Sequence, residues 1–131
     1  MVVLMVWCVV PALMADAWAT PLERVEFASA SQRRMGALIP GDRIQGDLAK
    51  PDGAGPYPAV IGLHGCAGMH DTTKQRLADE LVARSYVVLL VNSYATRGID
   101  HACTSSAFVT FLRRRPDAYG ALIFLAARVT S

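Results

Sequence analysis

The residues best suited to chemistry lie in one short loop, His64-Gly65-Cys66-Ala67-Gly68. The loop follows an apolar run, Ala59–Leu63, which has no polar alternation and is typical of a strand buried on both faces of a parallel sheet. Its glycines allow backbone N–H groups to point into a cleft. Such groups stabilise negative charge on a substrate oxygen, so the loop predicts one wall of an acyl-transfer site, an oxyanion loop.

Two other kinds of site compete for this loop. A dinucleotide fingerprint needs G-x-G-x-x-G, whereas Gly62, Gly65 and Gly68 are three residues apart. The chain also has five residues of metal-ligating types in two loops: His64, Cys66, His70, His101 and Cys103. None of the usual zinc spacings occurs among them. We therefore expect no metal and no organic cofactor.

The elements that must position the loop follow it along the chain. Thr72 and Gln75 form a capping-box pattern, and the inward stripe of the next helix includes Leu77 and Leu81, with Lys74 facing water. Residues 87–91 predict a second buried strand. Strand, loop, helix and strand form a βαβ unit, and ligands bind at the carboxyl ends of such strands.

The flanking segments complete an α/β prediction. Alternation predicts antiparallel strands over 22–29 and 43–50, joined through a turn at 40–42. Residues 108–115 predict a short helix that ends at Pro116. Asp117 should then cap a last helix through Arg128, with Leu122 and Leu125 inward. The three arginines before Pro116 (residues 113–115) are expected to form a solvated helix end.

Composition and the first residues indicate a single exported domain. Of the 131 residues 53% are hydrophobic and 18% charged, and the formal net charge of +2 argues against nucleic acid as a partner. Residues 1–19 resemble a signal peptide, which leaves a domain over 20–131 in the periplasm or outside the cell. An uncleaved leader would instead anchor the chain in a membrane.

Removal of the leader leaves two cysteines, Cys66 and Cys103. An even count in an oxidising compartment predicts a disulfide, which would stabilise the fold by roughly 4 kcal/mol in the chain-entropy model. Two unpaired thiols are the alternative.

Three segments, 58–68, 89–98 and 117–122, resemble the dienelactone hydrolase family of α/β-hydrolases in sequence, order and spacing. The resemblance implies that the Cys66 backbone N–H is an oxyanion donor set by His64 and Gly65. It also implies that Tyr94 and Arg97 contact a substrate carboxylate, although both residues are equally suited to packing on their neighbours. Gly65 replaces a glutamate that helps activate a cysteine nucleophile in the family, which favours serine as the nucleophile.

The family's nucleophile elbow, Gly-x-Ser/Cys-x-Gly, does not occur in these 131 residues, and the acid and histidine that follow the elbow in the family are expected to be missing with it. We therefore expect the N-terminal part of an α/β-hydrolase sheet, truncated before the elbow and inactive alone, whose substrate when completed is a small ester or lactone. The strand at 59–63 would then have one unpaired edge, which favours self-association. The alternative is a non-catalytic exported module that binds an anionic ligand or a partner protein.

Overall fold

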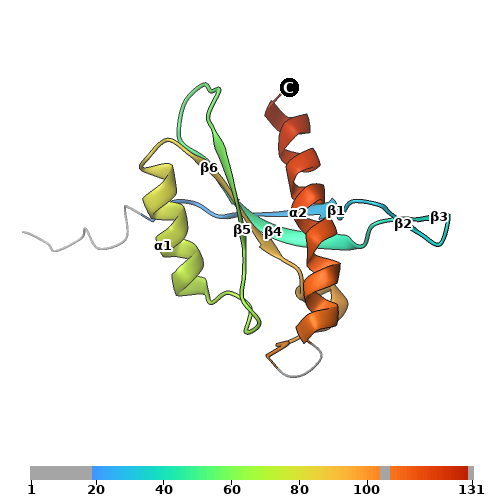
Figure 1. Cartoon of the computed structure of the whole chain (residues 1–131). Helices are drawn as coiled ribbons and strands as arrows, with labels where there is room; N and C mark the ends of the chain where they lie inside the picture. Colours follow the sequence, from blue (N-terminus) through green and yellow to red (C-terminus); the bar gives the residue numbers. More distant parts are fainter. Residues whose placement is uncertain (1–18, 104–106, 130–131) are drawn as a thin grey trace, which may run out of the picture.

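A computed structural model describes residues 19–103 and 107–129 of the chain. A four-stranded mixed sheet with the order β1-β4-β6-β5 lies between two helices (Figure 1). Its elements are β1 (Glu23–Ala28), β4 (Arg43–Ala49), β5 (Ala59–Leu63), α1 (Asp71–Val82), β6 (Val87–Asn92) and α2 (Ala107–Val129). The β1–β4 and β4–β6 pairs are antiparallel and the β5–β6 pair is parallel. The predicted α/β fold, with antiparallel strands before a parallel βαβ unit, is confirmed. The predicted leader lies outside the described residues except for Ala19.

The core has two halves because successive side chains of β6 point to opposite faces of the sheet. Val88 and Leu90 pack with Ala78 of α1 on one face. Leu89 and Val91 belong to the cluster on the other face, which also holds residues of α2. The sheet is therefore covered on both sides, which explains the continuous apolar run of β6.

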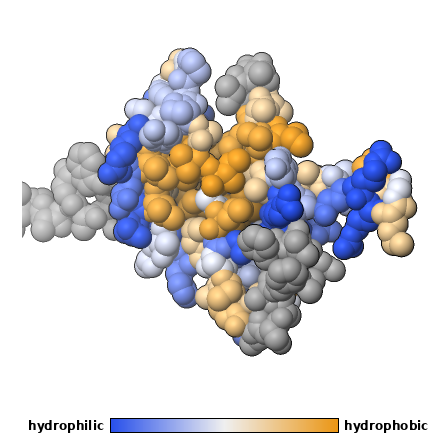
Figure 2. Space-filling model, in the orientation of Figure 1, coloured by the Kyte–Doolittle hydropathy of each residue, from blue (hydrophilic) through white to orange (hydrophobic). Residues whose placement is uncertain are grey.

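The prediction that β5 is buried on both faces was wrong. The predicted unpaired edge is present, because within the described residues β5 pairs with β6 alone and is an edge strand. Its three central residues are half-buried, and Leu63 is 42% exposed. Figure 2 shows hydrophobic residues gathered at the centre of the view, where Figure 1 places β5 between the two helices.

Helix α1 begins at Asp71, with His70 at the N-cap and no side-chain cap, so the predicted Thr72 capping box was wrong. The Gln75 amide instead donates to the Thr20 carbonyl (2.9 Å) and the Asp79 carboxylate (3.0 Å). The bond to Thr20 fastens the segment before β1 to the helix.

Lys74 was predicted to face water, and this prediction was wrong. Its side chain is 12% exposed, and its ammonium lies 3.1 Å from the carboxylate of Asp47 on β4. A buried strand carboxylate thus draws the lysine inward. The predicted inward stripe of α1 is confirmed, because Leu77 and Leu81 pack against the core.

Helix α2 runs through Pro116 without interruption, so the prediction of two helices was wrong. Pro116 is buried, and its carbonyl accepts the Ala30 N–H (2.8 Å). Asp117 is therefore inside the helix rather than at a cap. The inward stripe is Asp117, Ala121 and Leu125 at four-residue spacing, whereas Leu122 is 55% exposed.

A small hairpin was not predicted from the sequence. β2 (Gln32–Arg34) and β3 (Ala37–Ile39) pair with each other and extend away from the main sheet (Figure 1). The turn residues Met35 and Gly36 both have positive φ (47° and 85°), as short hairpin turns require. Every residue of both strands is exposed, so this hairpin contributes little to the core. Among the described residues, no helix is long and apolar enough to cross a bilayer.

Candidate functional site

His64 joins the carboxyl ends of β5 and β6. Its Nε2 accepts the backbone N–H of Ser93 (3.2 Å), and its Nδ1 lies 2.8 Å from the Gly65 carbonyl oxygen. The Ser93 N–H is a donor, so this network assigns the proton to Nδ1, which donates to Gly65. The residue is 5% exposed, and its ring meets the Tyr94 ring edge to face, with the ring centroids 4.3 Å apart.

Burial lowers the pKa of His64 below its ordinary value of 6.5. The imidazole is therefore neutral in the fold, and both of its nitrogens are engaged. The geometry gives His64 the role of a positioning residue that holds the start of the loop, since neither nitrogen is left to move a substrate proton.

The rest of the loop is held by a covalent bond and two hydrogen bonds. The predicted disulfide between Cys66 and Cys103 is present, with the Cα atoms 4.8 Å apart. The Ala102 N–H donates to the Cys66 carbonyl (2.7 Å), and the Gly68 N–H donates to the Gly65 carbonyl (3.3 Å).

This arrangement leaves the Cys66 N–H available. Residues 65–67 are exposed, and within the described part of the chain no acceptor lies on that N–H. The loop thus presents a fixed and unengaged backbone donor at the end of β5. The Cys66 sulfur, by contrast, is held in the disulfide and offers no thiolate.

Asn92 turns the chain at the end of β6. Its side-chain oxygen accepts the N–H groups of Tyr94 and Ala95, each at 3.0 Å, which begins the short 3₁₀ helix η1 (Ala95–Arg97). This turn buries Tyr94, which is 4% exposed, against His64. His64 of the predicted oxyanion loop and Tyr94, a predicted substrate-binding residue, therefore lie together.

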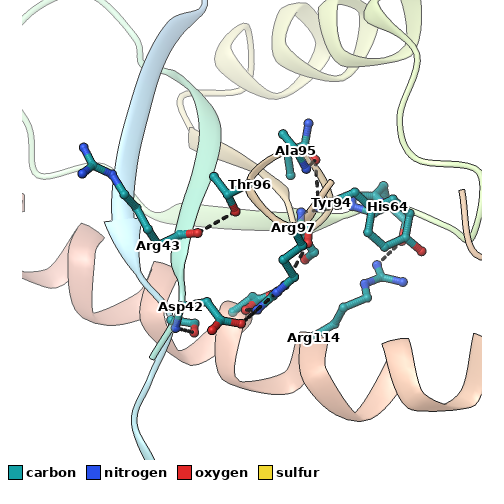
Figure 3. A network of polar contacts seen from close by, with 12 residues as sticks. Asp42, Arg43, His64, Tyr94, Ala95, Thr96, Arg97 and Arg114 are labelled. Carbon is teal, nitrogen blue, oxygen red and sulfur yellow. Dashed lines mark hydrogen bonds and ion pairs between the residues drawn. The ribbon is translucent and has the colours of Figure 1, made fainter. Parts of the chain in front are cut away.

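Arg97 points away from the loop into a cluster of carboxylates (Figure 3). Its two terminal nitrogens donate to both oxygens of Asp117 (2.7 and 2.9 Å), a residue that is fully buried. Its Nε and Nη2 donate to Asp42 (2.9 and 2.7 Å), and Nη1 also donates to the Ser93 carbonyl (2.8 Å).

These contacts occupy all five N–H donors of the guanidinium. The hydrogen bond to Asp117 is the main cause that raises the pKa of Arg97 further, so the side chain stays charged. Contact with a substrate carboxylate, as the sequence predicts for Arg97, would require it to release one of these partners.

Arg114 was missed by the sequence analysis, which placed it in a solvated helix end. Its guanidinium donates to the His64 carbonyl oxygen and lies 6.0 Å from the centre of the Tyr94 ring (Figure 3). Helix α2 is thereby attached to the end of β5. The three-arginine run before Pro116 held no sequence signal to distinguish Arg114 from its neighbours.

The candidate metal ligands of the sequence do not converge. In the described part of the chain, no three His, Cys, Asp or Glu residues are grouped so that they could hold a metal ion. His70 and His101 are exposed, and both cysteines are bonded to each other. The chemistry that this arrangement supports is the stabilisation of an anion by a backbone N–H.

The comparisons with known proteins find similarity to solved structures. No model of a known protein family matches the chain, and no curated protein matches it. Among solved structures, the chain is similar to the crystal structure of a "Putative Dienelactone Hydrolase" from Klebsiella pneumoniae, with a TM-score of 0.50 and 22% sequence identity over 84% of this chain. The chain has a hydrolase-like fold. It spans 44% of that protein's length, which fits the predicted first part of a hydrolase sheet.

Proposed function

We propose that this chain carries the oxyanion half of an exported carboxylic-ester hydrolase of the dienelactone hydrolase type. The observation that carries the proposal is the free N–H of Cys66 on a loop fixed at three points. These points are the His64 bridge to Ser93, the disulfide to Cys103 and the bond from Ala102. Such a donor stabilises the oxyanion that forms when a carbonyl carbon is attacked.

The attacking group is proposed to come from a separate polypeptide segment. The only described cysteines, Cys66 and Cys103, are bonded to each other, and His64 has no free nitrogen. The sequence holds several serines, but none stands in a Gly-x-Ser-x-Gly elbow. The unpaired edge of β5 is suited to receive a strand that carries a nucleophile, because its N–H and C=O groups on that side have no ladder partner in the described chain. The substrate class is a small ester or lactone.

The proposal is tested by adding a chromogenic aryl ester to the purified full chain. We expect no hydrolysis above the buffer rate. A saturable rate that co-purifies with the chain would overturn the claim that the attacking group is missing. Variants of Cys66 or Cys103 do not serve as the main test, because they also disturb the loop.

Completion of the site is tested with a second polypeptide. The probe is the part of a dienelactone hydrolase that runs from the strand before the nucleophile elbow through the catalytic acid and histidine, co-expressed with this chain. We expect ester hydrolysis by the complex and a loss of that activity in a His64→Ala variant of this chain. Complex formation without any gain in hydrolysis would contradict the proposed oxyanion role.

Export is proposed on the leader sequence and agrees with the disulfide, since oxidising compartments preserve such bonds. A thiol count on protein taken from the periplasm should find Cys66 and Cys103 unreactive before reduction and reactive after it. Two reactive thiols in untreated periplasmic protein would contradict the disulfide, and recovery of the expressed chain from the cytoplasm alone would contradict export.

A further inference from the structure

A hollow lies between the β2 hairpin strand and α2. It is lined by residues 30–34 and by Arg115, Pro116 and Tyr119 of α2, is open to solvent, and has a volume of about 410 Å³. This volume is within the range of about 300–1,000 Å³ for small-molecule sites. We call it the arginine hollow, because Arg33, Arg34 and Arg115 all line it and no Asp or Glu does.

The charges of this hollow are unbalanced, because its lining holds three arginines and no carboxylate. Outside the hollow, Arg84 and Arg114 also lack a carboxylate partner among the described residues, but each donates to a backbone carbonyl. Elsewhere the described arginines with carboxylate partners are Arg24, Arg43, Arg76, Arg97 and Arg128. Among the contacts between described residues, the side chains of Arg34 and Arg115 have no acceptor. Arg33 donates one N–H to the Gly36 carbonyl (3.1 Å), which leaves the rest of its guanidinium free.

The two walls of the arginine hollow are attached to each other. The Ala30 N–H donates to the Pro116 carbonyl (2.8 Å), which joins the segment before β2 to α2. Gly120 allows close approach there, because a Cβ at this position would lie 2.2 Å from the Ala28 carbonyl oxygen. The arginines on the two walls are therefore brought together by fixed backbone. Tyr119, which is 58% exposed, adds a hydroxyl and a ring at the hollow.

We propose that the arginine hollow binds a small multivalent oxyanion, a polycarboxylate or a molecule with two phosphate groups. Guanidinium groups match carboxylate and phosphate oxygens with paired N–H donors. An anion with two or more charges also relieves the mutual repulsion of three cations that no protein carboxylate neutralises. The hollow lies beside α2 and the chain that follows β1, and β1 and β5 are opposite edges of the sheet. The inference is therefore independent of the proposed hydrolase function.

The test is calorimetric titration of the full chain at low ionic strength with citrate and, separately, with inorganic pyrophosphate. The variant is Arg34→Ala/Arg115→Ala. Its matched control is Arg76→Ala/Arg84→Ala, which removes the same charge from exposed positions on and just after α1. We expect the wild-type chain and the control to bind alike and the first variant to bind at least about tenfold more weakly, equivalent to about 1.4 kcal/mol. If citrate binds more tightly, the ligand is assigned to the polycarboxylates. If pyrophosphate binds more tightly, the ligand is assigned to molecules with two phosphate groups.

A third variant, Arg34→Lys/Arg115→Lys, keeps the charge and removes the paired donors. We expect its affinity for the anion to lie between that of the wild-type chain and that of the Arg34→Ala/Arg115→Ala variant. Far-UV circular dichroism checks that all variants remain folded, which the exposure of the substituted side chains favours. The proposal is overturned if neither anion binds the wild-type chain at millimolar concentration. Equal losses of affinity in the two alanine variants would also overturn it, because they would indicate a general charge effect.

Discussion

A histidine with both ring nitrogens engaged acts differently from a histidine that transfers protons. His64 receives an N–H from Ser93 at one nitrogen and gives its own to Gly65 at the other. Protonation would add a hydrogen to Nε2, which would then face the Ser93 N–H, donor against donor. It would also place a charge on His64, a residue that is 5% exposed. The neutral state of His64 is therefore part of what holds the loop in place.

This arrangement predicts a pH dependence of stability. The folded pKa of His64 is below 6.5, chiefly because burial disfavours the charged ring, so the unfolded chain binds the extra proton first. The stabilising contribution is complete above pH 6.5 and declines as the pH falls below that value. We expect the melting temperature of the wild-type chain to drop between pH 7 and pH 5, and the His64→Asn variant to show a smaller drop.

The pH window separates this effect from that of the carboxylates. The pKa of Glu26 is lowered from 4.5, mainly by its hydrogen bond from Arg43, and that of Asp71 is lowered from 3.8, mainly by Lys74. Their contributions are lost only below these values. Parallel melting curves for wild type and His64→Asn between pH 7 and pH 5 would contradict the assigned role of His64.

The two carboxylates on Arg97 differ in burial and should differ in their effect on stability. Asp117 is fully buried, so removing it leaves a cation that is 11% exposed without its main partner. We expect Asp117→Ala to lower the free energy of unfolding by about 3–5 kcal/mol. Asp42 is 58% exposed, and Asp42→Ala should cost about 0–1 kcal/mol. Denaturant titration measures both, and equal losses would show that burial does not determine the strength of this cluster.

At the scale of elements, the end of α1 has a local conflict between residue and backbone. Ser85 adopts φ 64°, the left-handed conformation that glycine adopts most easily after a helix. The strain of a side chain there is about 1–2 kcal/mol, reduced by the greater entropy of glycine in the unfolded chain. We expect Ser85→Gly to raise the free energy of unfolding by about 0.5–1 kcal/mol, and Ser85→Ala, which keeps the Cβ, to give no gain. A gain from alanine equal to that from glycine would assign the effect to the hydroxyl instead.

The elements show which information the sequence held and which it lacked. Local patterns were sufficient for β4, β6 and the buried stripe of α1. Side-chain alternation indicated β4, a continuous apolar run indicated β6 and helical spacing indicated α1. The ion pairs were not accessible in this way. Arg97 meets Asp42 across 55 residues, and only the register of β4 brings Asp47 to Lys74. The continuous course of α2 through Pro116 was likewise not predictable from the local sequence, because a proline inside a helical pattern usually ends or kinks the helix.

The candidate site likewise has parts that local sequence patterns predict and parts that depend on tertiary contacts. The loop at residues 64–68 follows from glycine spacing after an apolar run, and the pairing of Cys66 with Cys103 follows from a count of two. The Arg114 contact with His64 depends on how α2 crosses the end of β5, which no local pattern encodes. The arginine hollow also requires two segments about 80 residues apart to be attached by backbone bonds.

For the whole molecule, we expect the open edge of β5 to decide whether the chain associates in solution. β5 has one strand neighbour among the described residues, and hydrophobic residues surround it (Figure 2). An unpaired apolar edge is a template for pairing with another chain, and charged side chains at an edge oppose such pairing. We expect the wild-type chain to form dimers or larger species at micromolar concentration, measured by light scattering after size-exclusion chromatography.

The substitution Leu63→Lys tests whether β5 is the contact. Leu63 is 42% exposed at the end of this strand, so a lysine there should shift the population towards monomer without opening the core. Leu38→Lys is the matched control, since Leu38 is 64% exposed on the hairpin strand β3, which belongs to a separate two-stranded sheet. If association uses β5, only the first variant loses it. A wild-type chain that is monomeric at all concentrations would show that the β5 edge tolerates solvent, and would weaken the proposal that a second polypeptide pairs with it.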